Sequence, residues 1–171
     1  MGFTQGNSTG DTTEGGGGGA VFVRGGRVKV VDSVFTSNRC DATGPDLGGA
    51  ALRVLSQYHG LPVIVATSTF TGNVCSNGAA LSSIGVSWQI YNSVFAYNEA
   101  IGTGANPARG GTPGGGSGGA IFFVSNDRTG QLRITSSTLQ HNVSRGFETA
   151  GFPGIFFLGQ GSPQVTDSTI T

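Results

Sequence analysis

The chain contains 171 residues, with thirty-two glycines, eleven phenylalanines, 11% charged residues and a formal net charge of zero. Glycine at this level without a Gly-X-Y period excludes collagen, and the 36% hydrophobic content argues against a disordered chain. The neutral balance removes the electrostatic reason to expect a nucleic acid partner. The sequence also has no run of about 18 apolar residues, so no membrane insertion is predicted.

Residues 1–15 are mostly polar, and we predict a flexible N-terminal segment there. This segment contains Asn7-Ser8-Thr9, which makes Asn7 a candidate glycosylation site. Residues 16–171 are predicted to form one domain, whose coils open near 18, 48, 78, 118 and 153. The Gly-rich stretch 102–117 is predicted to be a loop insertion. We expect the domain to continue, or to dock onto something, beyond residue 171.

A Ser-x-Phe-x-x-Asn phrase recurs along this domain, starting at "SVFTSN". Its first column is serine, at Ser33, Ser68, Ser93, Ser137 and Ser168. Its second column is large and apolar, at Phe35, Phe70, Phe95, Leu139 and Ile170. Its third column is asparagine, at Asn38, Asn73, Asn98 and Asn142. Stacked coils would place each column in a file, in which the amides and hydroxyls bond from coil to coil and the rings form a core.

A second strand-like segment follows a Gly-Gly-Ala or related opening in each repeat. Apolar residues two positions after the first small residue are predicted to face inward with the core, at Phe22, Leu52, Leu81, Phe122 and Phe156. The intervening positions would then face outward, and the most apolar of them are Val21, Val23, Ile121, Phe123, Ile155 and Phe157. We predict that this strip is an interface, covered either by the chain's own loop at 102–119 or by a neighbouring protomer or domain.

A period-2 segment upstream of each serine, such as Val28/Val30 and Trp88/Ile90, supplies a third strand. Three short strands per repeat without helical periodicity predict an all-β, parallel β-helix solenoid of about five coils with a Gly-rich loop insertion. Another β-solenoid or a β-sandwich is the rival fold.

The motif Gly118-Gly119-Ala120-Ile121 and the Phe-x-x-Asn phrases at 35–38, 70–73 and 95–98 resemble the repeats of chlamydial polymorphic outer membrane proteins. Related right-handed β-helix surface proteins share these repeats. The fourth repeat departs from the pattern, with Leu139 in place of Phe. The resemblance implies a right-handed coil and a secreted or surface-displayed passenger with adhesive or structural duties. It implies no catalytic residues.

Cys40 and Cys75 occupy the same column of adjacent repeats. Stacking would bring their Cα atoms to about 5 Å, which lies inside the range for a disulfide. The alternative is a pair of buried thiols, because the same column accepts Ala100 and Ser144. A disulfide would fit an oxidising compartment, and we predict an extracellular or cell-surface location.

We therefore predict a non-catalytic structural or adhesive module that associates with itself, with another surface protein or with a glycan. The alternative is a polysaccharide-active enzyme or glycan-binding module of the pectate-lyase-like type. Its candidate residues are the turn acids Asp41, Asp46 and Glu99 beside Arg39, with Tyr91 and Tyr97 as the candidate sugar-binding aromatics. Solvated turn acids are the simpler interpretation of this cluster. No spacing of cysteine or histidine predicts a metal, and no cofactor motif is present.

Overall fold

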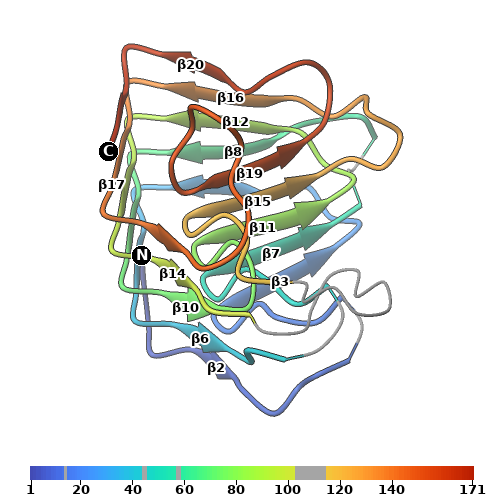
Figure 1. The fold of residues 1–171 in the computed structure, drawn as a ribbon, viewed down its shortest axis with the longest axis vertical. Coiled ribbons are helices and arrows are strands. Elements are labelled where there is room, and N and C mark those ends of the chain that lie inside the picture. The colour runs from blue at the N-terminus through green and yellow to red at the C-terminus, as the bar shows by residue number, and fades with distance from the viewer. Residues whose placement is uncertain (14, 44–45, 57–58, 103–114) are drawn as a thin grey trace.

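The computed structural model describes residues 1–13, 15–43, 46–56, 59–102 and 115–171. Within these residues the chain is all-β, and its twenty-one short strands form four parallel sheets with no helix (Figure 1). Along the chain, one strand of each sheet follows another in a fixed order before the cycle begins again. The fold is therefore the predicted parallel β-helix.

We number the sheets in the order in which the chain enters them. Sheet 1 contains β1 (Gly2–Thr4), β5 (Val34–Thr36), β9 (Thr69–Thr71), β13 (Val94–Ala96), β17 (Thr138–Gln140) and β21 (Thr169–Ile170). Sheet 2 contains β2 (Asn7–Ser8), β6 (Arg39–Cys40), β10 (Val74–Cys75), β14 (Glu99–Ala100) and β18 (Val143–Ser144). Sheet 3 contains β3 (Val21–Arg24), β7 (Leu52–Leu55), β11 (Leu81–Ile84), β15 (Ile121–Val124) and β19 (Ile155–Leu158). Sheet 4 contains β4 (Lys29–Val31), β8 (Val63–Ala66), β12 (Trp88–Tyr91), β16 (Leu132–Thr135) and β20 (Gln164–Thr166).

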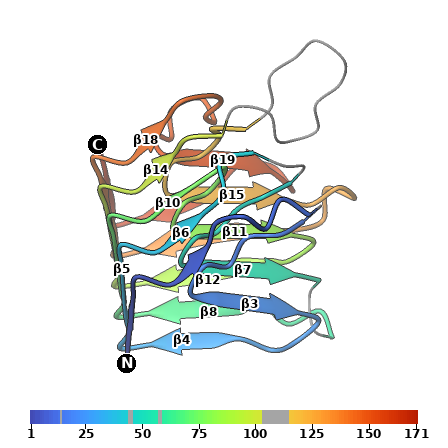
Figure 2. The ribbon, with the colours of Figure 1, turned by 90° about the horizontal axis from the view of Figure 1, so that it is seen from below.

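Each strand pairs in parallel with the strand that holds the same place in the next coil, and Figure 2 shows the resulting stack. A coil contains four strands rather than the three expected. The additional strands are those of sheet 2, which directly follow the asparagine column and are two residues long. Two residues are too few for an alternation of apolar and polar side chains to reveal a strand.

The N-terminal residues form the first coil, so the prediction of a flexible segment over residues 1–15 is wrong for its first half. Strand β1 pairs with β5, and β2 pairs with β6. The ring of Phe3 stacks on Phe35 with centroids 4.6 Å apart, and the backbone N–H of Gly6 donates to Asn38 Oδ1 at 2.8 Å. Residues 3–6 are a degenerate copy of the Phe-x-x-Asn phrase in which Gly6 replaces the asparagine, so the repeat was hidden.

The predicted orientation of sheet 3 is wrong in three of its five strands. The register aligns Leu52 with Val21 on one side and with Leu81 on the other, so these side chains share the inward column with Ile121 and Ile155. Phe22, Phe122 and Phe156 instead share the outward column with Arg53 and Ser82. Phe22 is 43% exposed, and the guanidinium of Arg24 lies 5.9 Å from its ring centroid.

The predicted interface strip is consequently part of the core. Ile121, Phe123 and Ile155 are at most 1% exposed, whereas Val21, Val23 and Phe157 are partly buried against the same cluster. The pattern is ambiguous because "GGAA" at 48–51 and "GAA" at 78–80 each contain two alanines, and either one can be aligned with Ala20 and Ala120. The second is the match, and an offset of one residue moves a whole strand face to the other side.

The core runs the length of the stack as columns of like side chains. Phe3, Phe35, Phe70 and Phe95 form one ring column, with neighbouring centroids 4.6–4.8 Å apart, and Leu139 and Ile170 continue it. The sheet 4 columns Val63/Trp88/Leu132 and Val65/Ile90/Ile134 face it. These spacings match the distance between hydrogen-bonded strands, so each ring packs on the ring of the next coil.

The insertion predicted at 102–117 lies largely outside the described residues. Its two ends are described, and the backbone N–H groups of Gly102 and Gly116 both donate to the carbonyl oxygen of Ser76, at 3.0 and 2.9 Å. The chain therefore leaves and rejoins the coil at one point, which explains how an insertion leaves the register of later coils unchanged.

Candidate functional site

Two sharp corners in each coil are fixed by the predicted ladders. At the corner between sheets 4 and 1, the residue before each ladder serine has a positive φ, as at Asp32, Thr67 and Asn92 with φ of 46–51°. Left-handed backbone costs a residue with a side chain roughly 1 kcal/mol, so the corner needs a stabilising contact. The ladder provides it, because the Oγ atoms of Ser68, Ser93, Ser137 and Ser168 each accept from the backbone N–H of the serine in the preceding coil at 2.9–3.2 Å.

The corner between sheets 1 and 2 holds the asparagine ladder. Asn38 Nδ2 donates to Asn73 Oδ1, Asn73 to Asn98 and Asn98 to Asn142, at 2.8–2.9 Å. Each Oδ1 also accepts a backbone N–H from the preceding coil, and each Nδ2 also donates to the carbonyl of a ring-column residue. Because the first three asparagines are fully buried, the ladder satisfies groups that water cannot reach.

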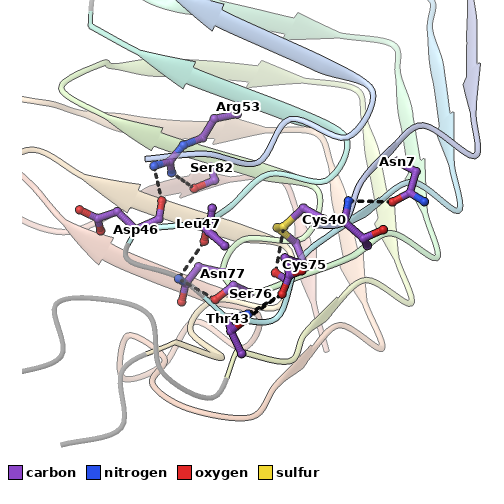
Figure 3. Close-up of a disulfide and its surroundings, with 12 residues drawn as sticks. Asn7, Cys40, Thr43, Asp46, Leu47, Arg53, Cys75, Ser76, Asn77 and Ser82 are labelled. Atoms are coloured by element: carbon purple, nitrogen blue, oxygen red, sulfur yellow. Dashed lines mark hydrogen bonds between the residues drawn. A yellow bond between two sulfur atoms is a disulfide. The ribbon is translucent and has the colours of Figure 1, made fainter. Parts of the chain in front are cut away.

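Cys40 and Cys75 form a disulfide that joins two adjacent coils on sheet 2 (Figure 3). Their Cα atoms lie 4.7 Å apart, close to the predicted separation. Both side chains are buried against Ala50 and Ala79 in a small apolar cluster separate from the main core. Of the two alternatives that the sequence left open, the structure shows the disulfide.

Replacing both cysteines by alanine is expected to lower the free energy of unfolding by about 3 kcal/mol, because the crosslink closes a loop of 35 residues. Alanine occurs naturally in this column at Ala100, so the substitution introduces no clash. Urea denaturation with and without a reductant measures the effect. A reductant should destabilise the native chain and leave the double variant unchanged. Equal stability of the oxidised native chain and the double variant would contradict this expectation.

Arg53 is a buried cation that the sequence did not single out. Its side chain is fully buried on the outward column of sheet 3, where it donates to Ser82 Oγ and to the backbone carbonyl of Asp46 (Figure 3). Burial lowers the pKa of Arg53 to about 10, an effect that the nearby charge of Asp46 opposes. Its Nε has no hydrogen-bond partner. The guanidinium thus fastens the turn that contains Asp46 to sheet 3, a role that neither pattern nor spacing predicts.

The predicted acidic cluster has separate partners at each of its members. Asp41 accepts from the backbone N–H of Gly10 at 3.0 Å and of Thr43 at 2.9 Å, and these bonds lower the pKa of its carboxyl. Glu99 Oε1 forms an ion pair with Arg145, whose Nε lies 2.8 Å away. Asp46 contributes its backbone carbonyl to Arg53. Among the described residues, no three His, Cys, Asp or Glu side chains gather as a metal site would require.

The two candidate aromatics do not share a face. The hydroxyl of Tyr91 donates to Gln89 Oε1 at 3.1 Å on sheet 4, whereas Tyr97 stacks on His141 at 5.0 Å at the corner after sheet 1. Asn7 is exposed on β2, and its Oδ1 accepts from the backbone N–H of Thr9 at 2.9 Å. Glycosylation of Asn7 stays a prediction.

The N-terminal end of the stack carries the strongest candidate for an interaction site. Side chains of the first two coils surround a cavity of about 360 Å³ at this end. The cavity is lined by Met1, Phe3, Val21, Val28, Lys29, Val30, Val31, Ser33 and Phe35. All but two of these side chains are apolar. The core columns therefore reach the surface here, at a coil whose four strands each have one unpaired edge.

No family model, curated protein or solved structure matches the chain. The resemblance to chlamydial outer membrane repeats accordingly stays a prediction. In the described part of the chain, no helix is long and apolar enough to cross a membrane.

Proposed function

We propose that this chain is a non-catalytic structural module of an extracellular or cell-surface β-helix, and that its end coils stack on a second copy of the chain. This proposal rests on the apolar cavity at the N-terminal end of the stack, where side chains of the core columns line a cavity at the surface. The predicted interface strip cannot make a lateral contact, because its residues line the core.

The repeat itself supplies the complementarity for end-to-end stacking. The inward columns that begin with Phe3, Val21 and Val30 end with Ile170, Ile155 and Val165. If the first coil of one copy stacked on the last coil of another, it would continue these columns of side chains at the same spacing as between coils within the chain. The unpaired strand edges would find partners by the same movement.

Two further observations support the proposed location and the absence of catalysis. The disulfide between Cys40 and Cys75 suits an oxidising compartment, since cytosolic thiols are kept reduced. The carboxylates Asp41 and Glu99, which an enzyme of the pectate-lyase-like type would use, are each held by their own neighbours.

Sedimentation of the purified chain over a wide concentration range tests the association. We expect the mass to rise with concentration, and we expect Val28→Asp to abolish that rise, because it places a charge on the cavity wall. Val94→Asp is the matched control, since Val94 is 37% exposed on the side of a middle coil. A native chain that stays monomeric throughout would overturn the proposal, as would association that Val94→Asp abolishes and Val28→Asp leaves intact.

A further inference from the structure

The outward face of sheet 1, on the left side of the molecule in Figures 1 and 2, carries two columns of uncharged side chains. Because the ring column points into the core, the residues on either side of it in each strand point outward. One outward column contains Gly2, Val34, Thr69, Val94, Thr138 and Thr169, and the other contains Thr4, Thr36, Thr71, Ala96 and Gln140. Six of these eleven residues are threonine, so methyl and hydroxyl groups dominate the face.

The hydroxyl groups of these six threonines are available to bind a partner. All eleven residues lie in the described ranges, and within those ranges no threonine hydroxyl of the two columns is hydrogen-bonded to the protein. The ladder serines next to them differ, since Ser68 Oγ, for example, donates to the carbonyl oxygen of Ala66 at 2.8 Å. A threonine hydroxyl can both donate and accept, and β-branching limits its side chain to few rotamers.

The lack of charge distinguishes this face from the sides of the stack next to it. The outward columns of sheet 4 contain Lys29 and Arg133, and the outward column of sheet 2 contains Arg39 and Glu99. On sheet 1 the exposed side chains include apolar ones, because Val34 and Val94 are 47% and 37% exposed. A partner of this face therefore has to be neutral and able to accept both hydroxyl and methyl groups.

Sheet 1 is also flat, which makes its two columns nearly straight rows. Neighbouring strands of a sheet are rotated by about 20–25° on average. Inside sheet 1, the planes of successive rings from Phe3 through Phe35 and Phe70 to Phe95 differ by only 10°, 5° and 1°. The serine ladder fixes one end of each strand and the asparagine ladder the other, and side-chain ladders of this kind stabilise untwisted sheets.

The resulting face is a rectangular lattice of hydroxyl and methyl groups. Along the stack it repeats with the coils, whose ring centroids lie 4.6–4.8 Å apart. Across the strands it repeats over two residues, a distance of about 6.6 Å. The prism face of ice presents water oxygens in a similar rectangle, with one side slightly shorter than the first distance and the other slightly longer than the second. That surface is neutral, and its water molecules both donate and accept hydrogen bonds.

Two other flat partners match the face less well. A crystalline polysaccharide would stack its sugar rings on aromatic side chains, and the two columns contain none. A second copy of the chain would need a more apolar centre with aromatic residues, as protein interfaces have, whereas this face offers two valines among threonines.

We propose that the outward face of sheet 1 binds ice, with the threonine hydroxyls joining the hydrogen bonds of ordered water and the methyl groups lying between its rows. Binding uses no charge, metal or cofactor. It is independent of end-to-end association, because the face lies on the side of the stack.

Slow growth of ice from a dilute, monomeric solution of the purified chain tests the proposal. Growing ice excludes solutes that have no affinity for it, so we expect the native chain to be enriched in the ice relative to the liquid. Thr71→Lys places a long charged side chain in the middle of the lattice and should abolish the enrichment. Thr135→Lys is the matched control, because Thr135 is also half-buried and points outward, but from sheet 4.

A second measurement uses a single ice crystal held in the protein solution. We expect the native chain and Thr135→Lys to separate the temperature at which the crystal grows from that at which it melts, and Thr71→Lys to lose this separation. Circular dichroism should show the same fold in all three proteins, since outward-facing substitutions change stability little.

Several outcomes would overturn the proposal. Exclusion of the native chain from ice is one, and equal enrichment of Thr71→Lys and the native chain is another. Loss of enrichment in Thr135→Lys as complete as in Thr71→Lys would remove the role of sheet 1. If the native chain is excluded from ice and Thr71→Lys lowers its sedimenting mass, the face is instead a contact between copies.

Discussion

Replacing Asn73 by alanine is expected to lower the free energy of unfolding by about 4 kcal/mol. Asn73 is fully buried in the middle of the asparagine ladder. Its Oδ1 accepts from both the backbone N–H and the side chain of Asn38, at 3.0 and 2.8 Å. Its Nδ2 donates to Asn98 and to the carbonyl of Phe35, at 2.8 and 3.2 Å.

Alanine would leave the backbone N–H of Asn38 and the carbonyl of Phe35 without these partners in a place that water does not reach. Each unsatisfied buried group costs about 1–3 kcal/mol, which gives the expected total. Urea denaturation followed by circular dichroism measures the loss.

Two other ladder variants serve as controls. Asn73→Asp keeps the shape but removes the donors, so it should also destabilise the fold strongly. Asn142→Ala changes the ladder's last member, which is only partly buried, and water can replace part of what is lost there. We expect the Asn142 variant to lose roughly half as much stability as the Asn73→Ala variant. Equal, small losses at both positions would show that the ladder does not stabilise the coil corners.

Replacing Phe70 by alanine is expected to cost about 4 kcal/mol by a different mechanism. Phe70 is fully buried and stacks on Phe35 and Phe95 with both centroid distances at 4.8 Å. Alanine removes the whole ring and leaves a cavity between two rings that are fixed by the spacing of their strands. Such a site collapses poorly, since neighbouring coils cannot approach more closely than the strand spacing allows.

Phe70→Leu is the matched control for the ring column. Leu139 occupies the same column two coils further along, so a leucine is compatible with the backbone there. We expect a loss of about 1 kcal/mol for leucine, measured by the same urea titration. A leucine variant as unstable as the alanine variant would mean that ring-on-ring stacking, rather than filled volume, stabilises the column.

The sequence predicted those parts of the fold in which a distinctive residue recurs at a fixed position of each repeat. Serine and asparagine recur at a fixed distance from a large apolar residue, and the three columns together define one register. The adjacency of Cys40 and Cys75 could be predicted for the same reason, because each lies five residues after the apolar residue of its phrase, Phe35 or Phe70. The sequence left open whether the two form a disulfide or remain thiols.

Other parts could not be predicted, each for a physical reason. In sheet 3 the residue used to align the repeats is a small residue next to another small residue. An alignment error of one position exchanges the side chains that face the core with those that face outward. The first coil was hidden because Gly6 supplies only a backbone N–H where later coils have asparagine. Burial of Arg53 depends on how the turn at Asp46 folds over sheet 3, which no local pattern encodes.

Nuclear Overhauser spectroscopy of the selectively labelled asparagine side chains tests the central claim most directly, since that claim is the alignment of equivalent residues in successive coils. The side-chain amide protons of Asn38 should show contacts with Asn73, those of Asn73 with Asn98, and those of Asn98 with Asn142, in a single unbranched series. Well-resolved amide signals that lack these contacts would contradict the stacked arrangement.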